Sequence, residues 1–163
     1  MDELQRKELE KLYKKVMRDR SLPKGAREGL QALWASHSGK GNEYRLQGKL
    51  REAIEEYRKD TELDITGHAE ATVVESAFCQ IGDTFMQLGE VENAIAAYEK
   101  ALELWREYGY GFAPHESLAE AYLSQGRIDD AIKICEESLK DLGSWKTRQI
   151  LVEAKRRKLE NEQ

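Results

Sequence analysis

Apolar residues recur along most of the chain with the spacing of amphipathic helices. Residues 2–18 carry them on one helical face (Leu9, Leu12, Tyr13 and Val16). A second helical stretch begins at Pro23, a residue suited to the first turn of a helix, and its spacing continues to Tyr44. Residues 145–163 form a further stretch with Trp145, Ile150, Leu151, Ala154 and Leu159 among charged residues, and we expect Ser144 to cap it.

Three segments between these ends superpose on one another at offsets of 41 and then 37 residues. They are GNEYRLQGKLREAIEEYRKD from Gly41, GDTFMQLGEVENAIAAYEKA from Gly82 and AEAYLSQGRIDDAIKICEES from Ala119. Each aligned column holds one kind of residue: a small residue, an aromatic residue, a glycine, an alanine followed by isoleucine, and a last bulky position. After the small residues the columns are Tyr44, Phe85 and Tyr122; Gly48, Gly89 and Gly126; Ala53, Ala94 and Ala131; and Tyr57, Tyr98 and Cys135.

Each column has a physical reason that predicts two antiparallel helices per segment. The small residue and the alanine let the helices approach closely, and the aromatic residues fill the space beside these contacts. The glycine takes the left-handed conformation that ends the first helix at low cost. Such a unit cannot bury its apolar face alone, so stacked units share one core. We therefore predict an all-α, right-handed solenoid of helix pairs with a capping helix at each end.

The columns resemble the tetratricopeptide repeat over residues 34–142. We divide the chain into an N-terminal cap (1–33), three repeats (34–66, 67–110 and 111–142) and a C-terminal cap (143–163). The spacing exceeds the usual 34 residues and the helix-ending proline is absent. Longer helices would account for both departures, and the units resemble the subgroup of about forty residues found in cell-polarity adaptors and kinesin light chains.

The charge of the chain is uneven. Formal charge is −5, made up of +3 in residues 1–28, −11 in 29–145 and +3 in 146–163.

No segment is apolar enough for a membrane span or a signal peptide, so the sequence predicts a cytoplasmic protein. Cys79 and Cys135 have neither disulfide-framework nor metal-site spacing, and we expect both to be reduced.

Side chains on the inner face of a solenoid are the candidates for partner binding, because helix packing does not require them. The predicted partner-binding groove consists of Ser38, Asn42, Arg45, Ser76, Cys79, Asp83, Met86, Gln87, Glu116, Glu120 and Leu123. The alternative is a solvated face without ligand preference. We hypothesise that the acids Asp83, Glu116 and Glu120 contact Lys or Arg of a partner, and that Met86 and Leu123 add apolar contact.

The resemblance also implies a comparison with the repeats that clamp the carboxylate of a chaperone tail. Asn42 resembles the clamp asparagine, but Ser38 stands where a lysine would be, and Glu116 and Glu120 replace a basic pair. A carboxylate beside two glutamates would be repelled. The sequence therefore argues against acidic chaperone tails and favours a basic or mixed segment.

No pattern of residues indicates an enzyme. His37 and His115 share a column with Phe78, which favours packing over catalysis, and His68 is expected to face solvent. Cys79 is expected in the groove as an accessible thiol without a local histidine to activate it. Metal-ligand spacings and phosphate-binding loops are absent, and no cofactor is expected.

The favoured function is a non-catalytic adaptor or scaffold that binds a protein or peptide segment. The second hypothesis is self-assembly, with basic end helices docking on the acidic body of a neighbouring copy. The third is a nucleic-acid-associated or lipid-associated factor that uses the basic residues of 11–27 and 155–158, and it is disfavoured because the rest of the chain is acidic.

Overall fold

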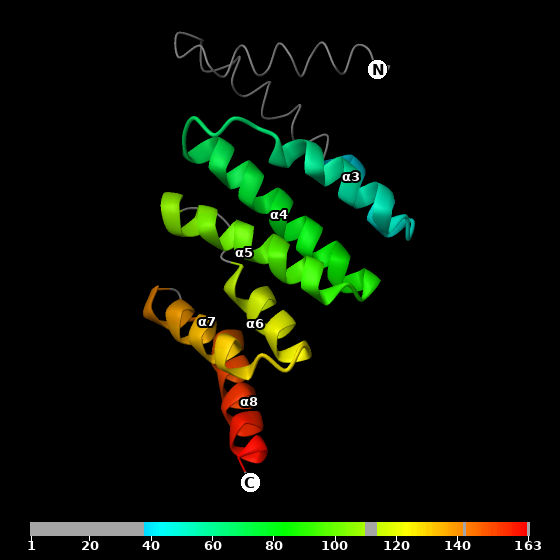
Figure 1. Cartoon of the computed structure of the whole chain (residues 1–163). Coiled ribbons are helices and arrows are strands. Elements are labelled where there is room, and N and C mark those ends of the chain that lie inside the picture. The colour runs from blue at the N-terminus through cyan, green and yellow to red at the C-terminus, as the bar shows by residue number, and fades with distance from the viewer. Residues whose placement is uncertain (1–37, 110–113, 142, 163) are drawn as a thin grey trace, which may run out of the picture.

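The computed structural model describes residues 38–109, 114–141 and 143–162, and within those ranges all regular structure is helical. Residues 38–46 are helical, and six further helices follow: α3 (Leu50–Thr61), α4 (His68–Leu88), α5 (Val91–Tyr108), α6 (His115–Ser124), α7 (Ile128–Asp141) and α8 (Trp145–Asn161). They stack one after another from the N-terminal side to the C-terminal side (Figure 1). The predicted all-α solenoid is confirmed, whereas the predicted cap at 1–33 lies outside the described residues.

The alanine column has the structural part that the repeat predicts. Ala53, Ala94 and Ala131 lie in α3, α5 and α7, the second helix of each pair, and each is fully buried at 0% exposure. The same core cluster contains the bulky column, Tyr57, Tyr98 and Cys135. One apolar interior therefore runs through the three helix pairs, as the stacking of repeats requires.

The glycine and aromatic columns meet in the turn inside each pair. Gly48, Gly89 and Gly126 have φ values of 74°, 75° and 71°, the left-handed region that a glycine occupies without a Cβ clash. The residue after each glycine donates its backbone N–H to the carbonyl of the aromatic column, at 2.9 Å onto Tyr44, Phe85 and Tyr122. The three turns are thus the same hydrogen-bonded helix ending.

Helix length differs between the pairs. The first helix of the middle pair, α4, has 21 residues and its partner α5 has 18, whereas α6 and α7 have 10 and 14. Residues 62–67 join α3 to α4, and their Leu63 is buried with Val74 in a small second cluster. No helix among the described residues combines the length and apolar character needed to cross a membrane.

The C-terminal helix begins as predicted but does not present the polar outer face expected of a cap. The Ser144 hydroxyl accepts the backbone N–H of Thr147 at 3.1 Å, the predicted N-cap. Ile150 and Ala154 are buried, as expected from their spacing. Trp145 and Leu159, however, are 69% and 61% exposed. These two apolar side chains stay at the surface because α8 packs on α6 and α7 through its other side.

Candidate functional site

A hollow of about 290 Å³ lies between α4 and α6, the first helices of two successive pairs. Most of the residues that line it are polar, and they come from both helices: Ser76, Cys79, Gln80 and Asp83 of α4, and Glu116 and Ser117 of α6 with the adjoining Pro114. The α4 residues stand three, four and seven positions apart, a spacing that keeps them on one helical face. Four of the eleven predicted groove residues, Ser76, Cys79, Asp83 and Glu116, are brought together here.

Asp83 is fixed by a hydrogen bond that repeats elsewhere in the chain. The Tyr98 hydroxyl donates to Asp83 Oδ1 at 2.7 Å, and one repeat earlier the Tyr57 hydroxyl donates to Asn42 Oδ1 at the same distance. Burial and this bond to Asp83 raise the pKa of Tyr98 above its usual range, so the phenol remains the donor. The predicted binding residues Asn42 and Asp83 therefore also tie the two helices of their pairs together.

The third repeat lacks this hydrogen bond, because Cys135 stands where the tyrosine would be. The small-residue column changes in the same repeat, where alanine replaces the glycine of the other two repeats. A methyl group on Gly41 or Gly82 would lie 2.4 or 2.5 Å from the ring of Tyr57 or Tyr98, whereas the third repeat has Ala119 in that column. A glycine faces each large ring, and an alanine faces the small cysteine. The interior of the third pair is filled by a different pair of residues.

The acids of the groove have cations of the same chain beside them. Arg45 Nη1 lies 4.0 Å from Asp83 Oδ2, and Lys146 Nζ of α8 lies 3.0 Å from Glu120 Oε1 and 4.0 Å from Glu116 Oε2. All five side chains are partly exposed, so water and salt screen these pairs. The groove is less acidic than its carboxylates alone imply, because three acids share it with two cations.

Glu116 also attaches α8 to the repeat array. Its Oε1 accepts hydrogen bonds from the Ser144 hydroxyl and, at 3.0 Å, from the Thr147 hydroxyl. Thr147 is 1% exposed. One Glu116 oxygen is thus committed to the junction between α6 and α8, and the assumption that packing does not require Glu116 is wrong.

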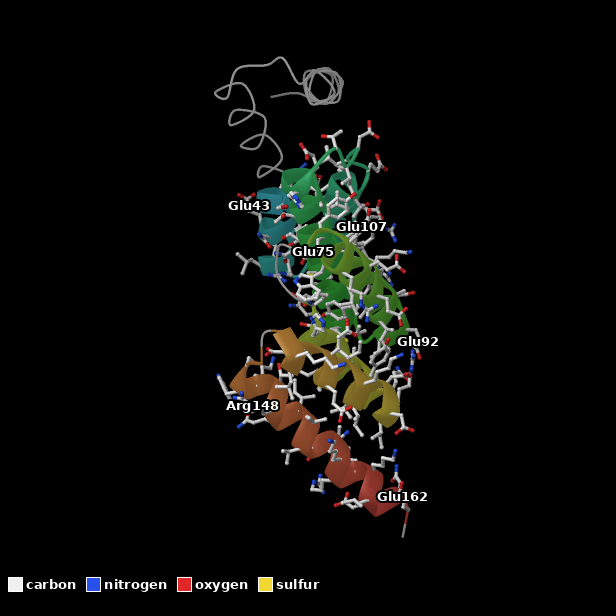
Figure 2. The ribbon with its side chains drawn as sticks, turned by 90° about the vertical axis from the view of Figure 1, so that its left-hand side faces the viewer. Glu43, Glu75, Glu92, Glu107, Arg148 and Glu162 are labelled. Carbon is white, nitrogen blue, oxygen red and sulfur yellow. The ribbon has the colours of Figure 1, made fainter. Side chains whose placement is uncertain are left out.

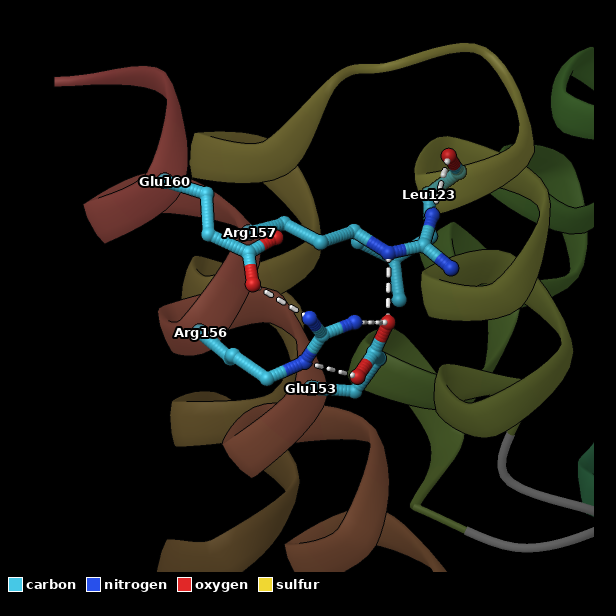
Figure 3. A network of polar contacts seen from close by, with 5 residues as sticks. All are labelled: Leu123, Glu153, Arg156, Arg157 and Glu160. Carbon is cyan, nitrogen blue, oxygen red and sulfur yellow. Dashed lines mark hydrogen bonds and ion pairs between the residues drawn. The ribbon is translucent and has the colours of Figure 1, made fainter. Parts of the chain in front are cut away.

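Met86 and Leu123, which were predicted to make apolar contact with a partner, also take part in the packing of the core. Both side chains pack against the core cluster. The Leu123 carbonyl further accepts Arg157 Nη1 of α8 at 3.4 Å (Figure 3). Both side chains are only partly buried, so packing uses one side of each, and their part in apolar contact with a partner stays a prediction.

The remaining predicted residues lie outside the hollow. Ser38 donates its hydroxyl to Asp60 Oδ2 at 2.8 Å, and Asp60 is fully buried in α3. Gln87 is exposed near the end of α4. Together with Asn42, Arg45 and Glu120 these positions extend the candidate surface on either side of the hollow, and their part in binding stays a prediction.

Three residues that line the hollow were not predicted from the sequence. Gln80, Ser117 and Pro114 line the hollow beside predicted residues. Gln80 follows Ser76 by four positions, so helical spacing alone was a sufficient signal for it. The cation Lys146 had no such signal, because α8 does not follow the repeat columns.

The two thiols are held in their protonated form. Burial, followed by the charges of Glu75 and Asp83, raises the pKa of Cys79 far above its usual range. Burial raises the pKa of Cys135 to about 11. Cys79 lines the hollow but has none of the electropositive surroundings that activate a cysteine nucleophile.

The described histidines serve packing or lie at the surface. His115 is 1% exposed, its ring meets Trp105 edge-on at 4.7 Å, and its Nε2 lies 3.8 Å from Glu137 Oε1. The expectation that His115 packs is confirmed. His68 is exposed at the start of α4, and His37 lies outside the described residues. In the part of the chain that the structure covers, no three His, Cys, Asp or Glu side chains are grouped to hold a metal ion.

Known proteins resemble this chain in sequence and in fold. Residues 73–140 match the family described as Tetratricopeptide repeat. A curated relative, the 43 kDa receptor-associated protein of the synapse from Tetronarce californica, is 37% identical over an alignment of 68 residues, and the match covers 38% of this chain. The chain spans only 16% of that relative's length.

Solved structures extend the likeness over most of the chain. The first TPR of Spaghetti (RPAP3), bound to the HSP90 peptide SRMEEVD, has a TM-score of 0.61 at 20% identity and covers 76% of this chain and 93% of its own. The first TPR domain of human RPAP3 has a TM-score of 0.58 at 22% identity, with 79% and 94% covered. These matches support the predicted repeat family, by sequence for residues 73–140 and by fold for the helical array.

Proposed function

Because the described helices have the fold of tetratricopeptide domains and residues 73–140 match that repeat, we propose that this chain is a non-catalytic interaction module, an adaptor that holds a segment of another protein. The hollow between α4 and α6 carries the proposal. Its polar side chains reach solvent in a concave place where an extended or helical segment fits. A solved domain of this fold holds a seven-residue peptide, which supports the assignment.

The charges around the hollow favour a basic or mixed segment. Asp83, Glu116 and Glu120 outnumber Arg45 and Lys146, so the local formal charge is −1. Each carboxylate lies beside a cation of the chain, which a lysine or arginine of the partner would join or replace. A segment that ends in several carboxylates would instead meet three acids and gain contact with only two cations.

Peptide titration tests this preference directly. The probes are SRMEEVD, the peptide of the solved complex, and SRMKKVK with an amidated end, in which every acid is replaced by lysine or removed. We expect the lysine peptide to bind more tightly, and its affinity to fall as salt is added, because the contacts are partly exposed. Equal or tighter binding of SRMEEVD would refute the charge preference. Binding of neither peptide, nor of a random basic peptide library, would refute the groove itself.

Matched variants locate the binding surface. Asp83→Asn keeps an oxygen for the Tyr98 hydroxyl, and Glu120→Gln removes a charge at an exposed position, so neither change should unfold the chain. Together they should weaken the lysine peptide by about fivefold, the effect of two exposed charge contacts. The control is Glu103→Gln, an exposed acid of α5 paired with Lys100. A loss of affinity in the control as large as in the double variant would place binding elsewhere.

The finer assignments of the sequence belong to the same proposal. We propose three repeats of the longer subgroup over 34–66, 67–110 and 111–142, with caps over 1–33 and 143–163. The lengths of α4 and α5 support the longer form. We also propose a cytoplasmic location, supported by two cysteines that form no disulfide with each other.

A further inference from the structure

The first turn of α8 differs in charge from the first turns of the helices before it. Each helix from α3 to α7 has an acidic residue there, whereas α8 has none and begins with Trp-Lys-Thr-Arg, which includes Lys146 and Arg148. The positive end of the helix dipole disfavours a cation at this position. Lys146 therefore does not stabilise the start of its own helix, and its contacts on α6 explain what it does there.

Of these two cations, Lys146 faces the array and Arg148 does not. Arg148 follows Lys146 by two positions, or about 200° around the helix, and Figure 2 shows it extending outward from α8. Lys146 Nζ lies 3.0 Å from Glu120 Oε1 and 4.0 Å from Glu116 Oε2, both on α6. Glu116 also lines the hollow between α4 and α6. The last helix thus places a cation at the two acids that the third repeat contributes to the predicted groove.

The two ends of this groove differ in how closely a cation of the chain holds the acids. Arg45 Nη1 lies 4.0 Å from Asp83 Oδ2, which is too long for a hydrogen bond. Lys146 Nζ is within hydrogen-bonding distance of Glu120 Oε1. A cation of a partner can therefore approach Asp83 without replacing a hydrogen bond from Arg45, whereas a cation that approaches Glu120 competes with Lys146 for the same oxygen.

Lys146 can leave Glu120 while α8 stays in place. The helix is held at this end by the hydroxyls of Ser144 and Thr147, which donate hydrogen bonds to Glu116 Oε1, and Thr147 is buried. The Lys146 side chain itself is 43% exposed, and an exposed ion pair contributes little to stability. Its displacement therefore requires only a change of side-chain conformation.

We propose that Lys146 is an internal competitor in the groove, and that a lysine or arginine of the partner reaches Glu116 and Glu120 by displacing it. This inference rests on the proposed function and adds the residue that sets how strongly the groove prefers basic segments. With Lys146 present, three acids share the groove with two cations. Without its charge, the same acids share the groove with Arg45 alone, and the local formal charge changes from −1 to −2. A basic segment should then bind more tightly and an acidic one more weakly.

Peptide titration of Lys146→Gln tests the competition. We expect amidated SRMKKVK to bind this variant about two- to fivefold more tightly than the unaltered chain, the effect of one exposed charge contact, and SRMEEVD to bind it less tightly. The difference should shrink as salt is added. Lys146→Arg keeps the competing charge and should show no gain with the lysine peptide. A gain for both peptides, or a loss for both, would overturn the inference, because a change of charge acts on them in opposite directions.

Two further variants place the competition at Glu120. Lys155→Gln is the matched control, since it makes the same change in a lysine of α8 that lies 3.0 Å from Glu136 of α7, outside the groove. It should leave both affinities unchanged, and a gain for the lysine peptide as large as that of Lys146→Gln would refute a local effect. In a chain that already carries Glu120→Gln, the gain from Lys146→Gln should shrink, because the acid for which the two cations compete is gone. An undiminished gain there would also overturn the proposal.

The outcomes separate this inference from the proposed function. If the unaltered chain binds the lysine peptide and Lys146→Gln binds it equally or more weakly, the inference fails and the proposed function stands. If neither peptide binds the unaltered chain or Lys146→Gln, both fail. The two proteins should have nearly the same urea midpoint of unfolding, because an exposed pair contributes little to stability. A markedly lower midpoint for Lys146→Gln would make Lys146 a structural residue and would overturn the inference as well.

Discussion

Replacing Gly82 by alanine tests the close approach of α4 and α5. The added methyl carbon would lie 2.5 Å from Cε1 of Tyr98, whereas carbon atoms in contact stand about 3.5–4.0 Å apart. The ring is 2% exposed and its hydroxyl is bonded to Asp83, so it has no free direction in which to move. Overpacking costs about 1–3 kcal/mol, and alanine recovers up to about 1 kcal/mol through helix propensity. We expect the free energy of unfolding to fall by about 1–2 kcal/mol.

Urea unfolding followed by far-ultraviolet circular dichroism measures this change. The decisive background is Tyr98→Cys, which gives the middle repeat the bulky-position residue of the third. There Gly82→Ala should become neutral, or stabilising by up to about 1 kcal/mol. Gly39→Ala is the control for propensity alone, because a methyl group on Gly39 meets no atom within 4 Å. Effects in the two backgrounds that agree within about 0.3 kcal/mol would refute the role assigned to Tyr98.

Three further predictions concern the turn, the cap and the charges. Gly126→Ala should cost about 1–2 kcal/mol in urea unfolding, because φ is 71° there although the surrounding space is open. Ser144→Ala should cost about 1 kcal/mol by the same measurement, since the N-cap bond is lost. Arg106, bonded to Glu137 at 2.7 and 2.5 Å, lowers the pKa of that carboxyl. The resulting stability is present above the unfolded pKa of about 4.3 and is lost as the pH falls through the folded value, so the advantage over Glu137→Gln should shrink below about pH 4 in acid titrations.

The features that were predicted correctly from the sequence are determined by contacts within one helix pair. The left-handed turn at Gly89 needs only a residue without Cβ and a carbonyl four positions earlier, and both are local. The burial of Ala94 follows from the same short range, because the two helices of a pair meet wherever the turn allows. The exchange of glycine and tyrosine for Ala119 and Cys135 was also visible in the columns. The reason why the two residues change together is visible only in the structure, where a methyl carbon on Gly82 would lie 2.5 Å from the Tyr98 ring.

The misjudged part of the candidate site depends on contacts between units. Glu116 was predicted to be free for partner binding because the packing within its own repeat does not require it. In the structure, the hydroxyls of Ser144 and Thr147 at the start of α8 donate hydrogen bonds to it. Lys146 lies beside Glu120 for the same reason. The angle at which α8 meets α6 fixes these contacts, and no spacing along the sequence records that angle. Charged columns next to a non-repeating helix are therefore the least predictable part of such a groove.

The placement of α8 also bears on self-assembly through its basic residues. Three lysines of α8 pair with carboxylates of the preceding helices. Lys146 lies 3.0 Å from Glu120, Lys155 lies 3.0 Å from Glu136, and Lys158 lies 2.7 Å from Asp129. Docking α8 on the acidic body of another copy would break these pairs to form equivalent ones, and exposed ion pairs contribute only about 0–1 kcal/mol each. Such an exchange gains little, so charge alone does not drive assembly at this end. The surplus that α8 has to offer is apolar, and it lies on the side that its lysines do not hold.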